Sequence, residues 1–379
     1  MPDPVYLDYA ATAPLRPEAR DAMLAVLSER WGNASSIHRW GREARAALED
    51  ARARFAAVIG ASPAEIVFTR GGTEADNLAV LGRAGLDPRS AVACSTIEHK
   101  AVLQSIRAAA AESRVLHQVE VDGDGRIDVD RVREIVAGDP PCVLSVVWAN
   151  NEVGVIQPVD EIAVLCRDAG VVFHSDAVQA LGKLPVRVDE VAAALLAFSA
   201  HKIGGPKGVG ALFIRRGTQL APLMHGGGQE RGLRPGTEDV AGAVAFASAA
   251  EAAEAERDEA VARIGALRDR LEAGLRARVP GLVVNAAAAP RLPTISNVSV
   301  PGADPEMLLM GLDLEGIAAS SGSACSSGAV TPSHVLTAMG ILPELAGPSV
   351  RFSLGRETTD AEIDRVLDVF ASVVERVRS

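Results

Sequence analysis

Ser199-Ala200-His201-Lys202 is the segment of this chain that says most about its fold and chemistry. It follows an apolar run over residues 191–198 and precedes a loop rich in glycine and proline over residues 204–208. The apolar run has the length and composition of a strand that is buried on both faces of a parallel sheet. A lysine at the end of such a strand is costly unless its amine is paired or used in chemistry. Lys202 is therefore a candidate functional residue.

Asp176 is the counterpart of this lysine, because it ends a second strand-like run over residues 171–175. The carboxyl ends of parallel strands meet at one edge of a sheet, which is where open α/β sheets bind ligands. An amine and a carboxylate at that edge suit pyridoxal 5'-phosphate (PLP), which forms a Schiff base with a lysine and needs a carboxylate beside its ring nitrogen. The two residues together predict a PLP site.

Length, composition and charge narrow the class of protein. The chain has 379 residues, of which 48% are hydrophobic and 23% are charged, so it is long enough for two domains of a globular enzyme. Its net charge of −11 argues against an extended nucleic-acid ligand, which requires clustered lysine and arginine. We find no secretion signal and no apolar run near the ~20 residues that span a bilayer. We expect a cytoplasmic protein without a membrane or direct nucleic-acid partner.

Strand-like runs alternate with helical patterns through the first two thirds of the chain. The predicted strands cover residues 65–69, 91–94, 115–119, 142–148, 171–174, 193–198 and 210–214. This alternation predicts an α/β fold with a mostly parallel, mixed sheet covered by helices. A helical stretch over residues 237–278, which crosses between domains or breaks once, leads into a smaller α+β unit. We assign residues 16–255 to the large domain, and residues 1–15 with 256–379 to the small one.

Polar groups follow several of these strands. Gly71-Gly72-Thr73 opens a helix, and its free backbone N–H groups and hydroxyl suit a phosphate, although a Gly-Gly pair before a helix is often only a turn. His99 begins another helix, either as an exposed cap residue or as an imidazole stacked on a cofactor ring. Asn151 follows the strand over 142–148. These side chains predict a polar ligand site at one sheet edge.

Cys325 and Arg351 each allow two interpretations. Cys325 lies in a loop of small residues over 320–328. It is either a surface cysteine in a linker or a nucleophile on a movable arm. Arg351 lies in a strand pattern, where its partner is an internal carboxylate or the carboxylate of an amino-acid ligand. The remaining cysteines lack zinc-site spacing and are expected to be buried apolar residues, and we predict no metal site: Cys94, Cys142 and Cys166.

Taken in order, these segments resemble the cysteine desulfurases, PLP enzymes of the class V aminotransferase, fold type I group. The resemblance runs from Tyr6 to Arg356, nearly the whole chain. Its specificity lies in the order and spacing of several motifs, and the loop that ends in Ser-Ala-Cys325 is similar to the group I branch of NifS and IscS. The matching motifs include Gly32-Asn33, Gly72-Thr73-Glu74, Glu98-His99-Lys100, Asn150-Asn151-Glu152, Ser199-Ala200-His201-Lys202 and His225-Gly226-Gly227-Gly228.

The resemblance implies a role for each matching residue. Lys202 would hold PLP, Asp176 would pair with its ring nitrogen, and His99 would stack on the ring and accept a thiol proton. Further cofactor contacts would come from Gly72, Thr73, Asn151, Gln179, Ser199 and His201, and from Thr237 across a homodimer interface. The carboxylate of L-cysteine would be held by Asn33, Asn151 and Arg351. Cys325 would attack the substrate sulfur, giving a persulfide for a sulfur-acceptor protein and releasing alanine.

Other interpretations and two departures from the family pattern remain. One alternative is another fold type I activity, such as an aminotransferase or a selenocysteine lyase. The loop with Cys325 argues against an aminotransferase, which needs no such thiol. A second alternative is a non-catalytic relative, and the presence of Lys202, Asp176 and Cys325 argues against it. Gly32-Asn33-Ala34 stands where the family usually has Gly-Asn-Pro. The chain also lacks the additional C-terminal tail of IscS-type members, so the resemblance leaves the acceptor open: an iron–sulfur scaffold, a tRNA-thiolation enzyme or another sulfur-modification system.

Overall fold

The computed structural model describes residues 4–111, 114–321 and 332–378. Within these residues, seven strands form the main sheet, and every strand except β8 runs in the same direction. In spatial order they are β2 (Ile66–Thr69), β8 (Gly210–Ile214), β7 (Leu195–Ser199), β6 (Val172–Asp176), β5 (Val143–Ser145), β3 (Val92–Ser95) and β4 (Leu116–Val119). The mostly parallel, mixed sheet that the sequence predicts is therefore confirmed.

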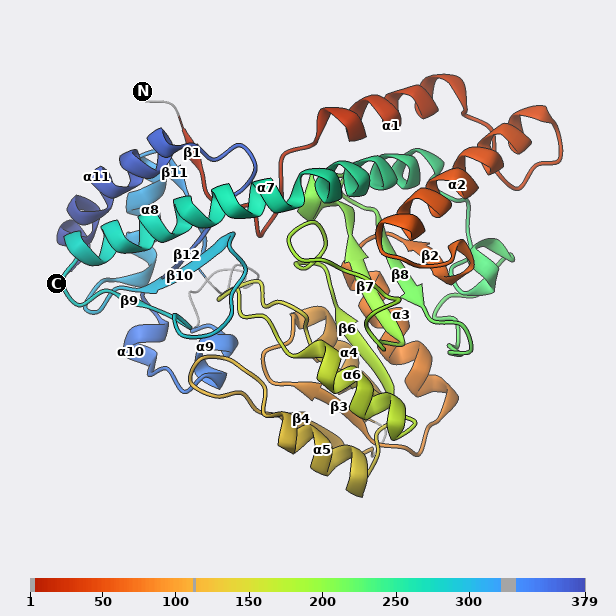
Figure 1. Ribbon diagram of the computed structural model, residues 1–379, viewed down its shortest axis with the longest axis horizontal. Coiled ribbons are helices and arrows are strands. Elements are labelled where there is room, and N and C mark those ends of the chain that lie inside the picture. Colours follow the sequence, from red (N-terminus) through yellow and green to blue (C-terminus); the bar gives the residue numbers. More distant parts are fainter. Residues whose placement is uncertain (1–3, 112–113, 322–331, 379) are drawn as a thin grey trace.

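Helices cover both faces of this sheet (Figure 1). Successive residues of a strand point to opposite faces, so both sets must be apolar when both faces are covered. On β7, Leu196 and Phe198 belong to the core shared with α2 and α7, whereas Leu195 and Ala197 pack with α3 on the other face. The ring of Phe55 on α2 lies 5.6 Å from that of Phe198, centroid to centroid. The apolar run before Lys202 is thus explained by burial on two sides.

The helices around the large sheet are α1 (Pro17–Glu29), α2 (Arg39–Val58), α3 (Gly72–Leu86), α4 (Lys100–Ala110), α5 (Val129–Gly138) and α6 (Val159–Asp168), with short 3₁₀ helices η1 (Pro63–Glu65), η2 (Ala200–Ile203) and η3 (Gln229–Gly232). Among them, α3 to α6 lie between the strands of the sheet in the chain, whereas α1 and α2 precede its first strand, β2. Helix α7 (Val240–Arg278) runs without a break from the large sheet to the second part of the molecule (Figure 1). Of the two predicted possibilities for this stretch, the crossing helix is the observed one.

The second part of the molecule is built on a small antiparallel sheet. The order of its strands is β12 (Ser349–Ser353), β10 (Ile295–Ser299) and β9 (Val283–Val284), and a parallel pair joins β1 (Val5–Tyr6) to β11 (Ile317–Ala318). Its helices are α8 (Pro305–Leu314), α9 (His334–Ala338), α10 (Pro343–Ala346) and α11 (Asp360–Val377). Its core combines the N-terminal residues Val5 and Leu7 with the second half of α7. The division at residues 15/16 and 255/256 stays a prediction.

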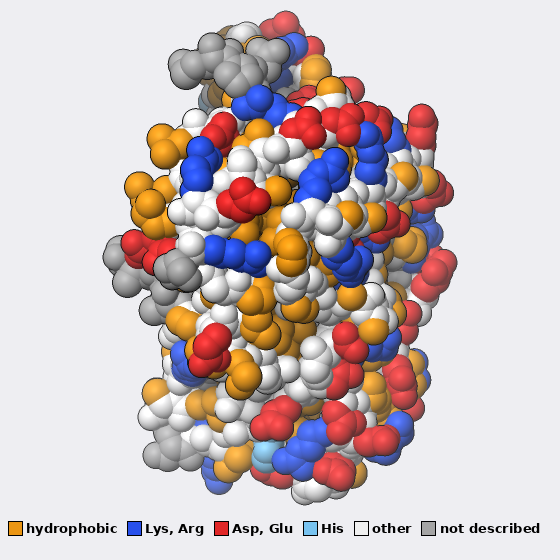
Figure 2. Space-filling view, turned by 90° about the vertical axis from the view of Figure 1, so that its left-hand side faces the viewer, with side chains coloured by type: hydrophobic (Ala, Val, Ile, Leu, Met, Phe, Trp, Pro, Cys, Tyr) orange, Lys and Arg blue, Asp and Glu red, His pale blue; other side chains and the backbone are white. Residues whose placement is uncertain are grey.

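The predicted elements differ from the observed ones mainly at their ends. The predicted strand over 142–148 is shorter than expected, because regular pairing is confined to β5. Single backbone hydrogen bonds continue beyond β5, from Val146 to His174 and from Trp148 to Asp176. Among the described residues, no helix combines the length and apolar character that crossing a membrane requires. On the face shown in Figure 2, acidic and basic side chains are interspersed.

Candidate active site

A cavity of about 320 Å³ opens at the carboxyl edge of the parallel strands. Its position follows from topology, since five of the lining segments directly follow β2, β3, β5, β6 or β7. Most of the predicted site residues line this one cavity: Gly72, Thr73, His99, Asn151, Asp176, Gln179, Ser199, His201, Lys202 and Arg351. Residues that are far apart in the chain are therefore brought together as the sequence predicts.

The amine of Lys202 lies at the wall formed by the N-terminal segment. Lys202 is on η2, the single turn that directly follows β7, so the end of the buried strand sets its position. Its Nζ donates hydrogen bonds to the backbone oxygens of Ala10, at 2.6 Å, and Ala11, at 2.7 Å. Lys202 is half-buried, and the cost of its position, inferred from the sequence, is reduced by these carbonyl groups at the cavity wall.

One end of the cavity is formed by the start of α3. Gly71 caps this helix with φ of 145°, in the backbone region that favours glycine, and no side chain caps the helix. A Cβ at Gly72 would lie 2.8 Å from Val178 Cγ2, so a side chain there would displace the loop after Asp176. An open groove extends from this helix end past Ser199 and His201. Free N–H groups at a helix start could hold the phosphate of a cofactor.

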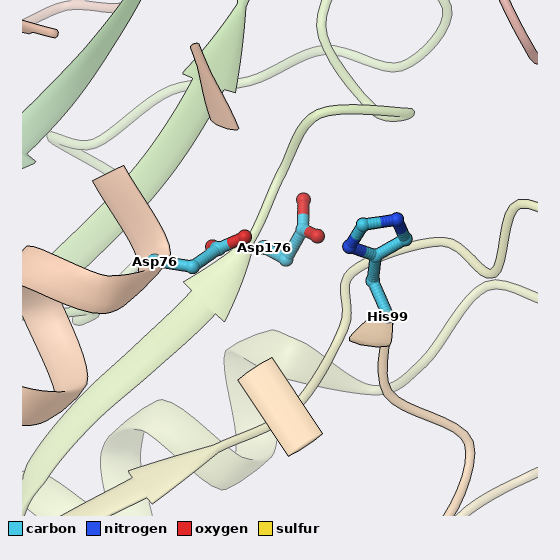
Figure 3. A group of neighbouring side chains, drawn as sticks. All are labelled: Asp76, His99 and Asp176. Carbon is cyan, nitrogen blue, oxygen red and sulfur yellow. The ribbon is translucent and has the colours of Figure 1, made fainter. Parts of the chain in front are cut away.

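Asp176 lines the cavity, and its side chain lies between those of Asp76 and His99 (Figure 3). One side-chain donor atom from each of these residues lies within 4.8 Å of the others. Asp176 Oδ1 accepts a hydrogen bond from Val178 N at 2.9 Å, and burial raises the pKa of Asp176 although His99 and Lys202 oppose the shift. A buried carboxyl of this kind could pair with a cationic ring nitrogen. The sequence predicts no metal site, and that stays a prediction.

His99 caps a helix as the sequence allowed, but it is half-buried and not exposed, and its stacking on a cofactor ring stays a prediction. It is the N-cap of α4, where its Nδ1 accepts a hydrogen bond from Ala101 N at 3.2 Å. Its side chain also lines the cavity, and its ring lies beside the Asp176 carboxyl (Figure 3). Burial lowers the pKa of His99, so the imidazole is neutral more readily than a free histidine and is able to accept a proton.

Behind Asp176 lies a layer of buried polar residues. His174 Nε2 is 3.4 Å from Asp76 Oδ1, without the alignment of a hydrogen bond, and its Nδ1 is 3.0 Å from Ser145 Oγ. Burial lowers the pKa of His174 to about 3 and raises the pKa of Asp76 well above its usual range, with Asp176 adding to the second shift. Both directions favour uncharged forms, so Asp176 is the carboxyl of this layer best placed to carry charge toward the cavity.

Arg351 reaches the cavity from β12 of the small sheet. Its Nη2 lies 2.7 Å from Asp8 Oδ1 and its Nη1 donates to the backbone oxygen of Asn151 at 3.0 Å. The internal salt bridge that the sequence left open is therefore present. Arg351 Nε is buried and has no hydrogen-bond partner among the described residues, so the guanidinium retains a donor for a further anion.

Asn33 and Thr237, two further predicted site residues, do not line the cavity of their own chain. Both are exposed, on loops joined by Arg45, which donates to Ala34 O at 3.0 Å and to Glu238 Oε1 at 2.9 Å. Cys325, the predicted nucleophile, lies outside the described residues. The other cysteines are free and buried as predicted, and burial raises the pKa of each thiol: Cys94, Cys142 and Cys166.

Several buried or cavity-lining residues were not predicted. Asp76 lies near the start of α3, one turn after Gly72. Glu152 accepts a hydrogen bond from Ser333 Oγ, which helps to place His334 at the cavity. Glu98 is fully buried and accepts a hydrogen bond from Val147 N at 2.7 Å. Each of these carboxylates has polar neighbours in the sequence, so the sequence carries no signal that separates them from solvent-exposed residues.

Glu98→Gln is expected to make stability less sensitive to pH. Burial raises the pKa of Glu98 from 4.5 to about 8, so the folded wild-type protein binds a proton that the unfolded chain releases, and its stability falls as pH rises through this window. Since the amide of the variant stays neutral, the advantage of the variant in unfolding free energy should grow by about 2–4 kcal/mol between about pH 5 and pH 8. Urea unfolding with excess PLP measures this difference; an advantage that is constant with pH would contradict it.

The family of the chain follows from comparison with known proteins. The aminotransferase class-V family matches residues 5–366. The chain belongs to this family. The cysteine desulfurase IscS of Dictyoglomus turgidum is 43% identical to it over 377 residues, which cover 99% of this chain and 95% of that protein. A solved NifS-like protein has a TM-score of 0.92 and 34% identity, covering 99% of this chain and 100% of its own. Another, described as SspA in complex with cysteine, has a TM-score of 0.82 and 31% identity, covering 94% and 100%.

Within the class-V family, the chain is a PLP-dependent cysteine desulfurase, which confirms the predicted family, activity and cofactor. The cavity fits this cofactor on chemical grounds. It presents an amine at Lys202, a buried carboxyl at Asp176 and the uncapped start of α3, which are the groups that an aldehyde, a ring nitrogen and a phosphate require. The lack of any side chain at Gly72 leaves room where α3 meets the loop after Asp176.

Proposed function

We propose that the cavity removes sulfur from L-cysteine with PLP held by Lys202 and passes the sulfur to Cys325. The observation that carries this proposal is the arrangement of Lys202 and Asp176 at the ends of neighbouring strands, in one cavity with Arg351. When bound, PLP supplies the electron sink that accepts the electrons of the broken carbon–sulfur bond. The residues of the chain must then bind and orient the cofactor and the substrate, and exchange protons with the substrate.

The cofactor contacts follow from the positions of the lining residues. Asp176 would pair with the ring nitrogen, and His99 would lie against the ring. Gln179, whose Nε2 donates to Ala10 O at 2.9 Å, would direct its other N–H at the ring oxygen. The phosphate would be held by N–H groups and hydroxyls at the start of α3 and after β7: Gly72, Thr73, Ser199 and His201. Asn151 would lie near the ring oxygen and the substrate.

The substrate carboxylate would bind to Arg351 and Asn151. A planar guanidinium binds a carboxylate through two parallel hydrogen bonds, and the Asp8 contact fixes its plane beforehand. A relative of similar fold is described in complex with cysteine, which supports an amino-acid ligand of this size. Asp8 would share the guanidinium with the substrate or yield to it.

The sulfur-transfer step balances without an external oxidant. The thiolate of Cys325 would attack the substrate sulfur, forming a sulfur–sulfur bond as the carbon–sulfur bond breaks. The bonding electrons go to carbon, which gains a proton and leaves as alanine, while the sulfur remains on Cys325 as a persulfide. His99 would accept the thiol proton, and Lys202 would move protons at the substrate carbon.

We further propose that two copies of the chain complete each other's sites. Thr237 and Asn33 are exposed on linked loops outside their own cavity, where they could reach the phosphate and the substrate of a partner copy. Large apolar side chains are exposed on the same corner, including Trp31, Ile37 and Trp40. Apolar surface of this kind is typical of protein interfaces. The homodimer expected from the family would cover it.

The persulfide would be delivered to a sulfur-acceptor protein in the cytoplasm. Three described cysteines are unpaired thiols, which is typical of a reducing compartment. The acceptor could belong to iron–sulfur cluster assembly, tRNA thiolation or another sulfur-modification system. The net charge of −11 favours contact with a protein over direct contact with nucleic acid.

The direct test of the proposed activity is product analysis with L-cysteine and a thiol reductant. Purified yellow protein should release alanine and sulfide in equal amounts. The proposal would be contradicted by yellow protein that converts another amino acid but releases neither alanine nor sulfide from L-cysteine.

Arg351→Lys is expected to weaken substrate binding much more than it slows the chemical step. Lysine keeps the charge but loses the fork that binds a carboxylate through two hydrogen bonds. We expect KM for L-cysteine to rise roughly 30- to 100-fold, which corresponds to the loss of one charged hydrogen bond, with kcat within about fivefold. The matched control is Arg376→Lys, an exposed arginine paired with Glu315 outside the cavity, which should leave KM unchanged. An unchanged KM in Arg351→Lys would exclude the proposed role.

A further inference from the structure

Lys183 does not line the cofactor cavity, but it forms hydrogen bonds with Gln179, which does. It lies in the turn after β6, four residues beyond Gln179, and its Nζ donates to Gln179 Oε1 at 2.9 Å and to the Gln179 backbone oxygen at 3.3 Å. In its ammonium form, which prevails below its pKa of about 7, Lys183 has donors only, so the side-chain atom that faces it is the amide oxygen. Lys183 thereby favours one of the two orientations of the Gln179 amide.

This orientation leaves an N–H of Gln179 for the cavity. The amide nitrogen donates one hydrogen to Ala10 O at 2.9 Å. Ala10 and Gln179 both line the cavity, and within the described part of the chain this nitrogen donates one side-chain hydrogen bond, the one to Ala10, so its second hydrogen is left for a ligand. With the amide reversed, its oxygen would meet the carbonyl of Ala10 and the ligand, and two acceptors would face each other.

The surroundings of Lys183 do not explain it as an ordinary salt bridge. Its side chain lines a small cavity of about 60 Å³ behind Lys202, which Arg16 and Glu256 also line. Arg16 already donates to Glu256 and, at 2.8 Å, to Ile203 O. Burial lowers the pKa of Lys183 to about 7, and the charge of Lys202 adds to this. Placing an amine here without a carboxylate partner in the described residues is costly, which points to a function.

We propose that Lys183 is a positioning residue, which holds the Gln179 amide with its N–H directed at the ring oxygen of PLP. The proposal rests on the role proposed above for Gln179. A donor at this oxygen stabilises its anionic form and so favours the cofactor state that has lost its shared proton. Lys183 would act on the cofactor through Gln179, without touching it.

The test is a double-mutant cycle on the PLP-loaded protein, read by visible absorption against pH and by the dissociation constant of PLP. Lys183→Met should raise the midpoint of the absorption titration by about one pH unit and weaken PLP binding about tenfold, the size of one hydrogen bond. Gln179→Ala should do the same, and Lys183→Met should add little in the Gln179→Ala background. Neither readout depends on desulfurase activity, so they separate this proposal from the proposed function.

Two further variants keep the result interpretable. Lys183→Gln retains a neutral donor for Gln179 and should recover part of both effects, and it replaces Lys183→Met should that variant not fold. Arg187→Met removes a charge from the same loop, where Arg187 pairs with Asp189 in solvent, and should change neither readout. Lys202 and the other charged groups and histidines that line the two cavities stay in every variant: Arg16, Asp76, His99, Lys100, Glu152, Asp176, His201, Glu256, His334, Arg351 and Arg356. If Lys183→Met shifts the midpoint equally with and without Gln179, or not at all, the proposal is wrong.

Discussion

Lys202→Ala is expected to yield a protein that carries no covalently attached PLP and has lost roughly 10⁴-fold or more in turnover. The amine is the only cavity-lining group at the end of β7 that can form a Schiff base, and no other described lysine shares its carbonyl contacts with Ala10 and Ala11. The same amine is the proposed carrier of protons at the substrate carbon. Borohydride treatment followed by peptide mass spectrometry measures the attachment, and product release measures turnover.

A rescue experiment separates loss of chemistry from loss of fold in the Lys202→Ala protein. A small alkylamine added in excess should restore part of the turnover, because it supplies the missing amine in a cavity that is otherwise intact. Circular dichroism should match that of the wild type. A Lys202→Ala protein that still retains borohydride-fixed PLP on another residue would refute the assignment of Lys202.

Cys325→Ala is expected to keep the yellow cofactor and lose sulfur transfer by roughly 10³-fold or more. The thiolate is the proposed acceptor of the substrate sulfur, and no step in binding PLP or L-cysteine needs it. The visible spectrum should still respond to added L-cysteine, which shows that substrate reaches the cofactor. Sulfide and alanine release from L-cysteine measure the loss.

The matched control for this variant is Cys166→Ala. Cys166 is fully buried in α6, and burial raises the pKa of its thiol to about 12, so it is not a thiolate near neutral pH. Cys166→Ala should lower stability slightly by leaving a small cavity and keep sulfur release within about twofold. Normal turnover in Cys325→Ala, or loss of turnover in Cys166→Ala, would refute the proposed nucleophile.

The parts of the site that could be predicted from the sequence are those at the ends of buried strands. Lys202 follows β7, Asp176 ends β6 and His99 follows β3, so an apolar run in the sequence precedes each of them. Parallel pairing then brings the three to one edge without any further information. Apolar runs likewise made the order of helices and strands predictable. The end of β5 was not predictable, because the apolar run and single hydrogen bonds continue beyond the regular strand.

The parts that could not be predicted depend on contacts between distant segments. The salt bridge of Arg351 joins β12 to Asp8 near the N-terminus, and Lys202 donates hydrogen bonds to the backbone oxygens of Ala10 and Ala11. Sequence patterns describe one element at a time and do not encode such pairs. Lys183 and Asp76 were overlooked for a related reason, because a single charged residue in a turn or a helix is normally a solvent-exposed one.

Sulfur from L-cysteine is expected to pass through Cys325, and mass spectrometry of the Cys325 peptide after one turnover without a thiol reductant measures this step directly. We predict one added sulfur atom on this peptide for each alanine released, and no addition on the peptides of Cys94, Cys142 or Cys166. Alanine formed with an unmodified Cys325 peptide, and with free sulfide in equal amount, would contradict it.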